Sequence, residues 1–130
     1  MKTPLRILVA EDGLNLQKAL EAVLTAEGHV VRVVEHGGLA LGLLKAGESY
    51  DLLITDQSMP CMKGLELVEE IRHDPNLCGL PAVVFTTDDY QEFVDRVRSL
   101  DAFHAAKPSL DELKRAIEEA LAWGDKRNAK

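Results

Sequence analysis

Short runs of apolar residues alternate along the chain with segments in which apolar residues recur every three or four positions. The short runs have the length of buried strands, and the periodic segments have the spacing of amphipathic helices. The expected strands cover residues 5–10, 29–34, 52–55, 81–86 and 101–106. A helical pattern follows each expected strand, with apolar positions that include Leu20, Leu43, Val68, Val97 and Ile117. The fifth run is the least strand-like, because it contains Asp101, His104 and alanines.

Five strand–helix units in succession predict an α/β fold with a doubly wound, five-stranded parallel sheet. The strands are mainly apolar, as expected for a sheet that helices cover on both faces. Gly28 is expected to end the first helix and Gly124 the last, since glycine readily takes the left-handed conformation that follows a helix. We therefore expect one domain over residues 1–124 and a short, flexible, basic tail over residues 125–130.

The composition argues against several classes of protein. The formal net charge of −7 is unlike that of a nucleic-acid binder, which needs a basic face to neutralise phosphates. No apolar run is long enough to span a membrane, so no membrane segment is expected. The N-terminus reaches an acidic pair too early for a signal peptide, which favours a cytoplasmic location.

The cysteines and most histidines suggest no chemistry of their own. Cys61 and Cys78 are too few for a disulfide framework and lack metal-site spacing, so we expect free thiols. His29, His36 and His73 share no common spacing. We interpret these three histidines as ordinary surface or helix-end residues.

Polar residues with matching chemistry follow four of the five expected strands. Glu11 and Asp12 follow the first and Asp56 the third, Thr86 ends the fourth, and Lys107 follows the fifth. Functional sites of open parallel sheets form beyond the carboxyl ends of the strands, so these side chains are expected to meet at one edge. Carboxylates held close together repel one another unless a cation compensates their charge. Mg²⁺ suits such a cluster, because it binds one or two carboxylates together with phosphate oxygens and water.

Each of these residues also has an ordinary structural interpretation. Asp12 has the type and place of an N-cap for the first helix, and Asp56 those of the first residue of a turn. Thr86 is a common residue type at a strand end, and a lone Lys107 would usually be a solvated surface lysine. The coincidence of these groups at four strand ends favours the functional interpretation, since clustered ionisable groups mark functional sites.

Five segments then resemble a known family. They appear in order along the chain at residues 7–12, 51–56, 59–64, 81–87 and 107–108. Together they resemble the receiver domain of bacterial two-component response regulators, close in size to the stand-alone chemotaxis type. The resemblance runs from about Leu5 to Leu121 and implies a flavodoxin-like (βα)5 receiver fold.

The resemblance implies a role for each acidic residue. Asp56 would accept a phosphoryl group from the phosphohistidine of a sensor histidine kinase or a histidine phosphotransfer protein. Glu11, Asp12 and Asp56 would bind Mg²⁺, with the backbone carbonyl of Ser58 as a further ligand. The chain would catalyse only its own phosphorylation and dephosphorylation, and would not otherwise be an enzyme.

The resemblance also implies a switch. Thr86 would turn inward to bind the phosphoryl group, Lys107 would pair with it, and the Lys107–Pro108 bond would be cis. A phosphoryl group adds charge of roughly −1.5 to −2 and strong acceptors, which reshape the surface around it. The face formed by the fourth helix, the fifth strand and the last helix would change and be read by a downstream protein partner. The chain would be a monomer or a weak, phosphorylation-dependent dimer.

Two positions depart from the family pattern. His104 stands where a tyrosine or phenylalanine is usual, and a smaller, ionisable ring there would make the switch weaker or pH-sensitive. The simpler interpretation, which we favour, is a solvated strand residue. Thr87 replaces a smaller residue after the switch hydroxyl and would narrow access to Asp56.

Two alternatives belong to other functional classes. The first is a receiver-like interaction module that works without phosphorylation; the acids, Thr86 and Lys107 argue against it. The second is a small phosphatase with an aspartyl-phosphate intermediate. That chemistry usually needs a second acid two residues after the nucleophile, where this chain has Ser58.

Overall fold

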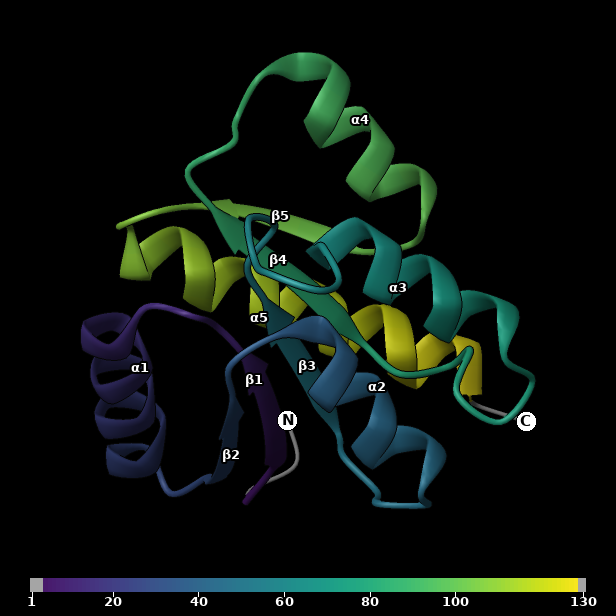
Figure 1. Cartoon of the computed structure of the whole chain (residues 1–130), viewed down its shortest axis with the longest axis horizontal. Coiled ribbons are helices and arrows are strands. Elements are labelled where there is room, and N and C mark those ends of the chain that lie inside the picture. The colour runs from purple at the N-terminus through teal and green to yellow at the C-terminus, as the bar shows by residue number, and fades with distance from the viewer. Residues whose placement is uncertain (1–3, 129–130) are drawn as a thin grey trace.

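The computed structural model describes residues 4–128, which form one five-stranded sheet. All strand pairs are parallel, and the strand order is β2-β1-β3-β4-β5 (Figure 1). The strands are β1 (Arg6–Ala10), β2 (Val30–Val34), β3 (Leu52–Thr55), β4 (Ala82–Thr86) and β5 (Phe103–Ala106). The doubly wound (βα)5 prediction is therefore confirmed.

Five helices cover the two faces of the sheet (Figure 1). They are α1 (Leu14–Ala26), α2 (Gly37–Lys45), α3 (Gly64–His73), α4 (Gln91–Ser99) and α5 (Leu110–Asn128). Alternate strand residues face opposite sides, so the core has two layers. Ile7 and Val9 pack with α1 and α5, whereas Leu8 and Ala10 pack with α2, α3 and α4. No helix within residues 4–128 has the length and apolar character needed to cross a membrane.

The helices α1 and α4 end in the same hydrogen-bonded turn, which α2 also makes at Gly47. After α1, Gly28 has φ +93°, and the N–H of His29 donates to the carbonyl of Leu24. After α4, Asp101 takes the same role with φ 54°, and the N–H of Ala102 donates to the carbonyl of Val97. Both turns satisfy carbonyls that a helix end leaves free. The prediction for Gly28 is confirmed, and β5 begins at Phe103 because the two residues before it close α4.

The last helix is longer than expected. It continues through Gly124 to Asn128, so the prediction that Gly124 ends it is wrong. Gly124 is buried against Pro81, whose Cγ would lie 2.6 Å from a Cβ at this position. The glycine therefore allows close packing inside the helix rather than a turn after it. Residues 125–128 of the expected tail belong to α5, residues 129–130 lie outside the described part, and the domain boundary at residue 124 stays a prediction.

The three histidines of the helix ends lie where they were expected, with one difference. His36 precedes α2 and accepts a hydrogen bond from the N–H of Leu39, and His73 is the last residue of α3. His29 follows α1 but is buried, and its Nδ1 accepts a hydrogen bond from the N–H of Leu5 at 3.1 Å. Both cysteines are free thiols, as predicted.

Candidate functional site

Three carboxylates meet at the carboxyl edge of the sheet. Glu11 follows β1 and Asp56 follows β3, with 4% and 7% of their surfaces exposed, whereas Asp12 is exposed to solvent. One carboxylate oxygen from each of the three lies within 4.8 Å of the others. Asp12 is not the N-cap of α1, because that position belongs to Gly13. The three acids therefore offer the oxygen ligands that a small divalent cation needs.

Lys107 lies between the two buried carboxylates. Its Nζ is 2.9 Å from Oε1 of Glu11 and 3.1 Å from Oδ2 of Asp56. The Lys107–Pro108 peptide bond is cis, as expected from the family resemblance. The backbone N–H of Lys107 donates to the carbonyl of Thr86 at 3.0 Å, which fixes the lysine beside the end of β4. A single ammonium group thus compensates two carboxylates that reach the site from different strands.

This arrangement raises the pKa values of both Glu11 and Lys107. Burial raises the pKa of Glu11, and the neighbouring charge of Asp56 raises it further, although hydrogen bonds from Lys107 and the Gly13 N–H act against the shift. Burial alone would lower the pKa of Lys107. Its hydrogen bond to Glu11 and the charges of both carboxylates outweigh burial, so the pKa of Lys107 is raised. The site therefore favours a charged lysine and has spare negative charge for a second cation.

Thr86 and Thr87 face different surroundings. Thr86 is buried at the end of β4, and its hydroxyl oxygen accepts a hydrogen bond from the N–H of Asp88 at 3.3 Å. Thr87 is exposed to solvent. The hydroxyl of Thr86 is thus engaged with the loop that leads into α4, so any rotation of this side chain would release a contact of that loop.

His104 is not a solvated strand residue, so that interpretation is wrong. The side chain is half-buried, and its ring packs edge-on against Phe93 of α4 with centroids 6.0 Å apart. Its Nε2 donates to the carbonyl of Asp88 at 2.7 Å, because a carbonyl can only accept. Asp88 therefore contacts both Thr86 and His104 through its backbone. The imidazole ties β5 to the loop before α4.

Sequence reasoning missed residues that hold the acids in place. The N–H of Gly13 donates to Oε2 of Glu11 at 3.0 Å, and Gln17 donates to the Glu11 carbonyl at 2.5 Å. The N–H of Gln57 donates to Oδ1 of Asp56 at 2.7 Å. These contacts are made by backbone groups or by an ordinary glutamine, so residue type alone gives no sign of them. Ser58 is exposed, and its carbonyl stays a predicted ligand.

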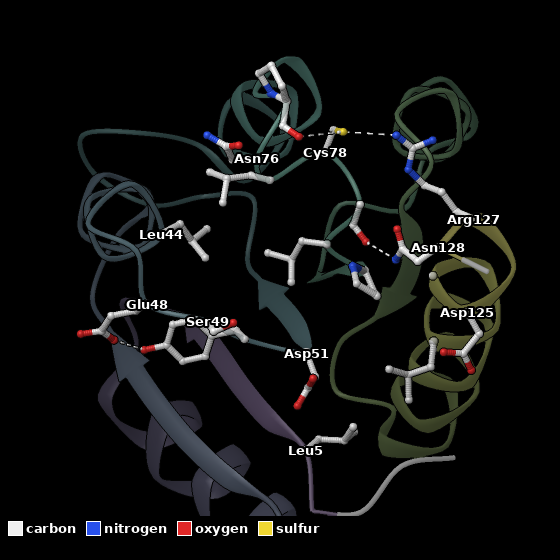
Figure 2. A pocket seen from close by; sticks show the side chains of 18 of the residues that line it. Leu5, Leu44, Glu48, Ser49, Asp51, Asn76, Cys78, Asp125, Arg127 and Asn128 are labelled. Atoms are coloured by element: carbon white, nitrogen blue, oxygen red, sulfur yellow. Dashed lines mark hydrogen bonds between the residues drawn. The ribbon is translucent and has the colours of Figure 1, made fainter. Parts of the chain in front are cut away.

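A separate pocket of about 990 Å³ opens at the opposite edge of the sheet (Figure 2). The segment between α2 and β3, the segment between α3 and β4, and the end of α5 form its walls. Figure 2 shows Arg127 directed toward the sulfur of Cys78 and Asn128 at the same wall. The pocket shares no lining residue with the carboxylate cluster.

Comparison with known proteins identifies the family. Residues 7–118 match the response regulator receiver domain, so the chain belongs to this family. The chain is 32% identical over 123 residues to a chemotaxis protein CheY homolog of Campylobacter jejuni, covering 92% of this chain and 95% of that protein. It is 36% identical over 117 residues to response regulator protein PmrA of Pseudomonas aeruginosa, covering 87% of this chain but 51% of that protein.

Solved structures show the same fold. The chemotaxis response regulator CheY4 of Vibrio cholerae superposes with a TM-score of 0.81 at 23% identity, over 92% of this chain and all of that one. Response regulator protein TrrA of Thermotoga maritima, in complex with Mg(2+)-BeF, gives a TM-score of 0.75 at 30% identity. That match covers 89% of this chain and 98% of TrrA. The resemblance found in the sequence is thus confirmed at the level of family and fold.

Proposed function

We propose that this chain is a phosphoryl-accepting signalling switch in a two-component phosphorelay, with Asp56 as the acceptor. The observation that carries the proposal is the meeting of Asp56, Glu11 and Lys107 in one buried contact, with Asp12 beside them. Three different strand ends supply this contact, and Thr86 is the last residue of β4, which lies between β3 and β5.

The acids and the lysine suit phosphoryl transfer. A carboxylate oxygen of Asp56 forms a bond to phosphorus while the phosphorus–nitrogen bond of a donor phosphohistidine breaks, and the electron pair leaves on the donor nitrogen. Mg²⁺ held by Glu11, Asp12, Asp56 and the Ser58 carbonyl would offset the charge of the phosphoryl oxygens. Lys107 would offer a second cation to the same oxygens. The Mg(2+)-BeF complex of the related TrrA supports this ion.

The same contacts support a change of surface on phosphorylation. Thr86 would exchange the N–H of Asp88 for a phosphoryl oxygen, and Lys107 would shift from Glu11 toward the new charge. These movements would reach the face of α4, β5 and α5 through His104, while the exposed Thr87 would limit access to Asp56. We propose that a sensor histidine kinase or a histidine phosphotransfer protein supplies the phosphoryl group and that a downstream protein reads this face. The proposed oligomeric state is a monomer or a weak, phosphorylation-dependent dimer.

Mass spectrometry of the intact protein tests the acceptor. We expect incubation with acetyl phosphate and Mg²⁺ to add one phosphoryl group, and EDTA to prevent the addition. Asp56→Asn is expected to remove it, because an amide is a poor nucleophile. Asp89→Asn is the matched control, because Asp89 is an exposed acid that follows β4 at the same edge of the sheet. This variant should be modified like the unchanged protein. Modification that persists in Asp56→Asn, or that needs no divalent ion, would refute the proposal.

Magnesium binding is expected to weaken on mild acidification. The raised pKa of Glu11 means that this ligand takes up a proton at a higher pH than an ordinary glutamate, whose pKa is near 4.3. Metal binding needs the deprotonated carboxylate, so the Kd for Mg²⁺ should rise as the pH falls from 7.5 through the raised pKa. Isothermal titration calorimetry at a series of pH values measures this. A Kd that stays constant even at about pH 4.3, where an ordinary glutamate is already half protonated, would show that Glu11 is not a titrating ligand.

A further inference from the structure

The segment that follows Asp56 folds back onto it where α3 begins. The N–H of Gly64 donates to the carbonyl of Gln57 at 3.1 Å. The next N–H, that of Leu65, donates to the side-chain Oε1 of Gln57 at 2.8 Å. Gln57 thus binds two of the N–H groups that the start of a helix leaves without partners. The half-buried glutamine side chain acts as a cap for α3, although it lies seven residues before the helix.

The same residue holds the acceptor carboxylate. The backbone N–H of Gln57 donates to Oδ1 of Asp56 at 2.7 Å, while Oδ2 of Asp56 faces Lys107 at 3.1 Å. The two oxygens have different partners on different sides, which fixes the plane of the carboxylate. Any movement of the Gln57 peptide would release Oδ1 and allow this plane to turn.

Gly64 brings the helix into direct contact with the acceptor. A Cβ at Gly64 would lie 2.1 Å from the backbone oxygen of Asp56, so only glycine allows this approach. The start of α3 therefore packs directly against the Asp56 peptide, and the side chain of Gln57 is hydrogen-bonded to the same turn of the helix. The position of residue 57 is set by α3, which is a rigid element, and not by the loop alone.

We propose that the side chain of Gln57 is a positioning residue for phosphoryl acceptance: by capping α3 it holds its own backbone N–H against Asp56. This inference rests on the proposed function for its effect on rate, but the hydrogen bonds that it invokes do not. An uncharged hydrogen-bond acceptor such as the amide oxygen of Gln57 suits this position. A further carboxylate there would add to the negative charge of the acidic cluster.

The test compares side chains of similar size with and without an acceptor. Gln57→Met keeps the length and loses the oxygen, whereas Gln57→Glu keeps an acceptor for the Leu65 N–H. At saturating Mg²⁺ and acetyl phosphate, we expect Gln57→Met to lower the phosphorylation rate constant about tenfold, since small misplacements of reacting groups are costly. The acetyl phosphate concentration for half-maximal rate should stay unchanged. Amide exchange at Leu65 should accelerate in Gln57→Met and remain slow in Gln57→Glu.

His36→Leu is the matched control, because it removes the side-chain cap of α2 in the same way without a contact to Asp56. It should lose a similar amount of stability in urea unfolding and keep its phosphorylation rate. Equal slowing by His36→Leu would refute the proposal, because the effect would then be general. An unchanged rate and unchanged Leu65 exchange in Gln57→Met would also refute it. If the unchanged protein accepts no phosphoryl group, the proposed function fails, and the exchange measurement still decides whether Gln57 caps α3.

Discussion

Replacing Lys107 with alanine is expected to destabilise the metal-free protein by about 3 kcal/mol, because it leaves two buried carboxylates without their cation. The side chains of Glu11 and Asp56 are only 5% and 8% exposed, so water cannot fully take over the role of the ammonium group. The raised pKa of Lys107 means that its contribution to folding is complete at neutral pH and is lost only as the pH rises through that raised value.

Urea unfolding in EDTA and in Mg²⁺ measures this effect. Binding of Mg²⁺ to the folded state should restore part of the lost stability in Lys107→Ala, since the ion compensates the same carboxylates. Lys114→Ala is the control, because Lys114 pairs with Glu27 at 3.1 Å on an exposed surface. That pair should contribute less than about 1 kcal/mol. Equal losses in the two variants would mean that Lys107 does not neutralise the acidic cluster.

Arg72→Leu should cost the fold about 4 kcal/mol, because it removes a half-buried cation with several hydrogen bonds. The guanidinium of Arg72, at the end of α3, donates to four backbone carbonyls, those of Cys78, Leu80, Leu100 and Asp101. It also lies over the ring of Trp123, 4.5 Å from the centroid. Burial lowers the pKa of Arg72 to about 10, so the group stays charged at neutral pH. Leucine would fill the space and leave the carbonyls without donors.

Two further variants separate charge from geometry. Arg72→Lys keeps the charge but loses the planar fork that reaches several carbonyls, so most of the loss should remain. Arg96→Leu removes an exposed arginine of α4 and should change the stability by less than about 0.5 kcal/mol. If thermal or urea unfolding shows that Arg72→Lys is as stable as the unchanged protein, the carbonyl contacts contribute little and the charge alone matters.

The sequence predicts the fold well because the pattern of apolar residues changes clearly between strands and helices. The prediction from the sequence is wrong where one residue type fits two different structural roles, such as a helix end and a close packing contact. Gly124 has the place of a helix end, yet its lack of a side chain serves packing against Pro81. Asp101 and Ala102 resemble a strand start, yet they close α4, because their hydrogen bonds are local to that helix.

The candidate site follows the same division. The strand-end rule predicts that Glu11, Asp12, Asp56 and Lys107 meet, and the structure brings their side chains together. The sequence does not reveal which side chains around the site form hydrogen bonds with backbone groups. The engaged ring of His104 depends on a carbonyl sixteen residues earlier, and no residue pattern reports such a contact.

The contacts of Arg72 and the acidic cluster lie at opposite edges of one sheet. A strand of four or five residues, at about 3.3 Å each, separates the two edges by roughly 15 Å. Free-energy changes at sites this far apart, with no shared partner, generally add. A substitution in the acidic cluster can lower the stability of the fold. A stabilising substitution near Arg72 can therefore offset that loss without changing the chemistry of the acidic cluster.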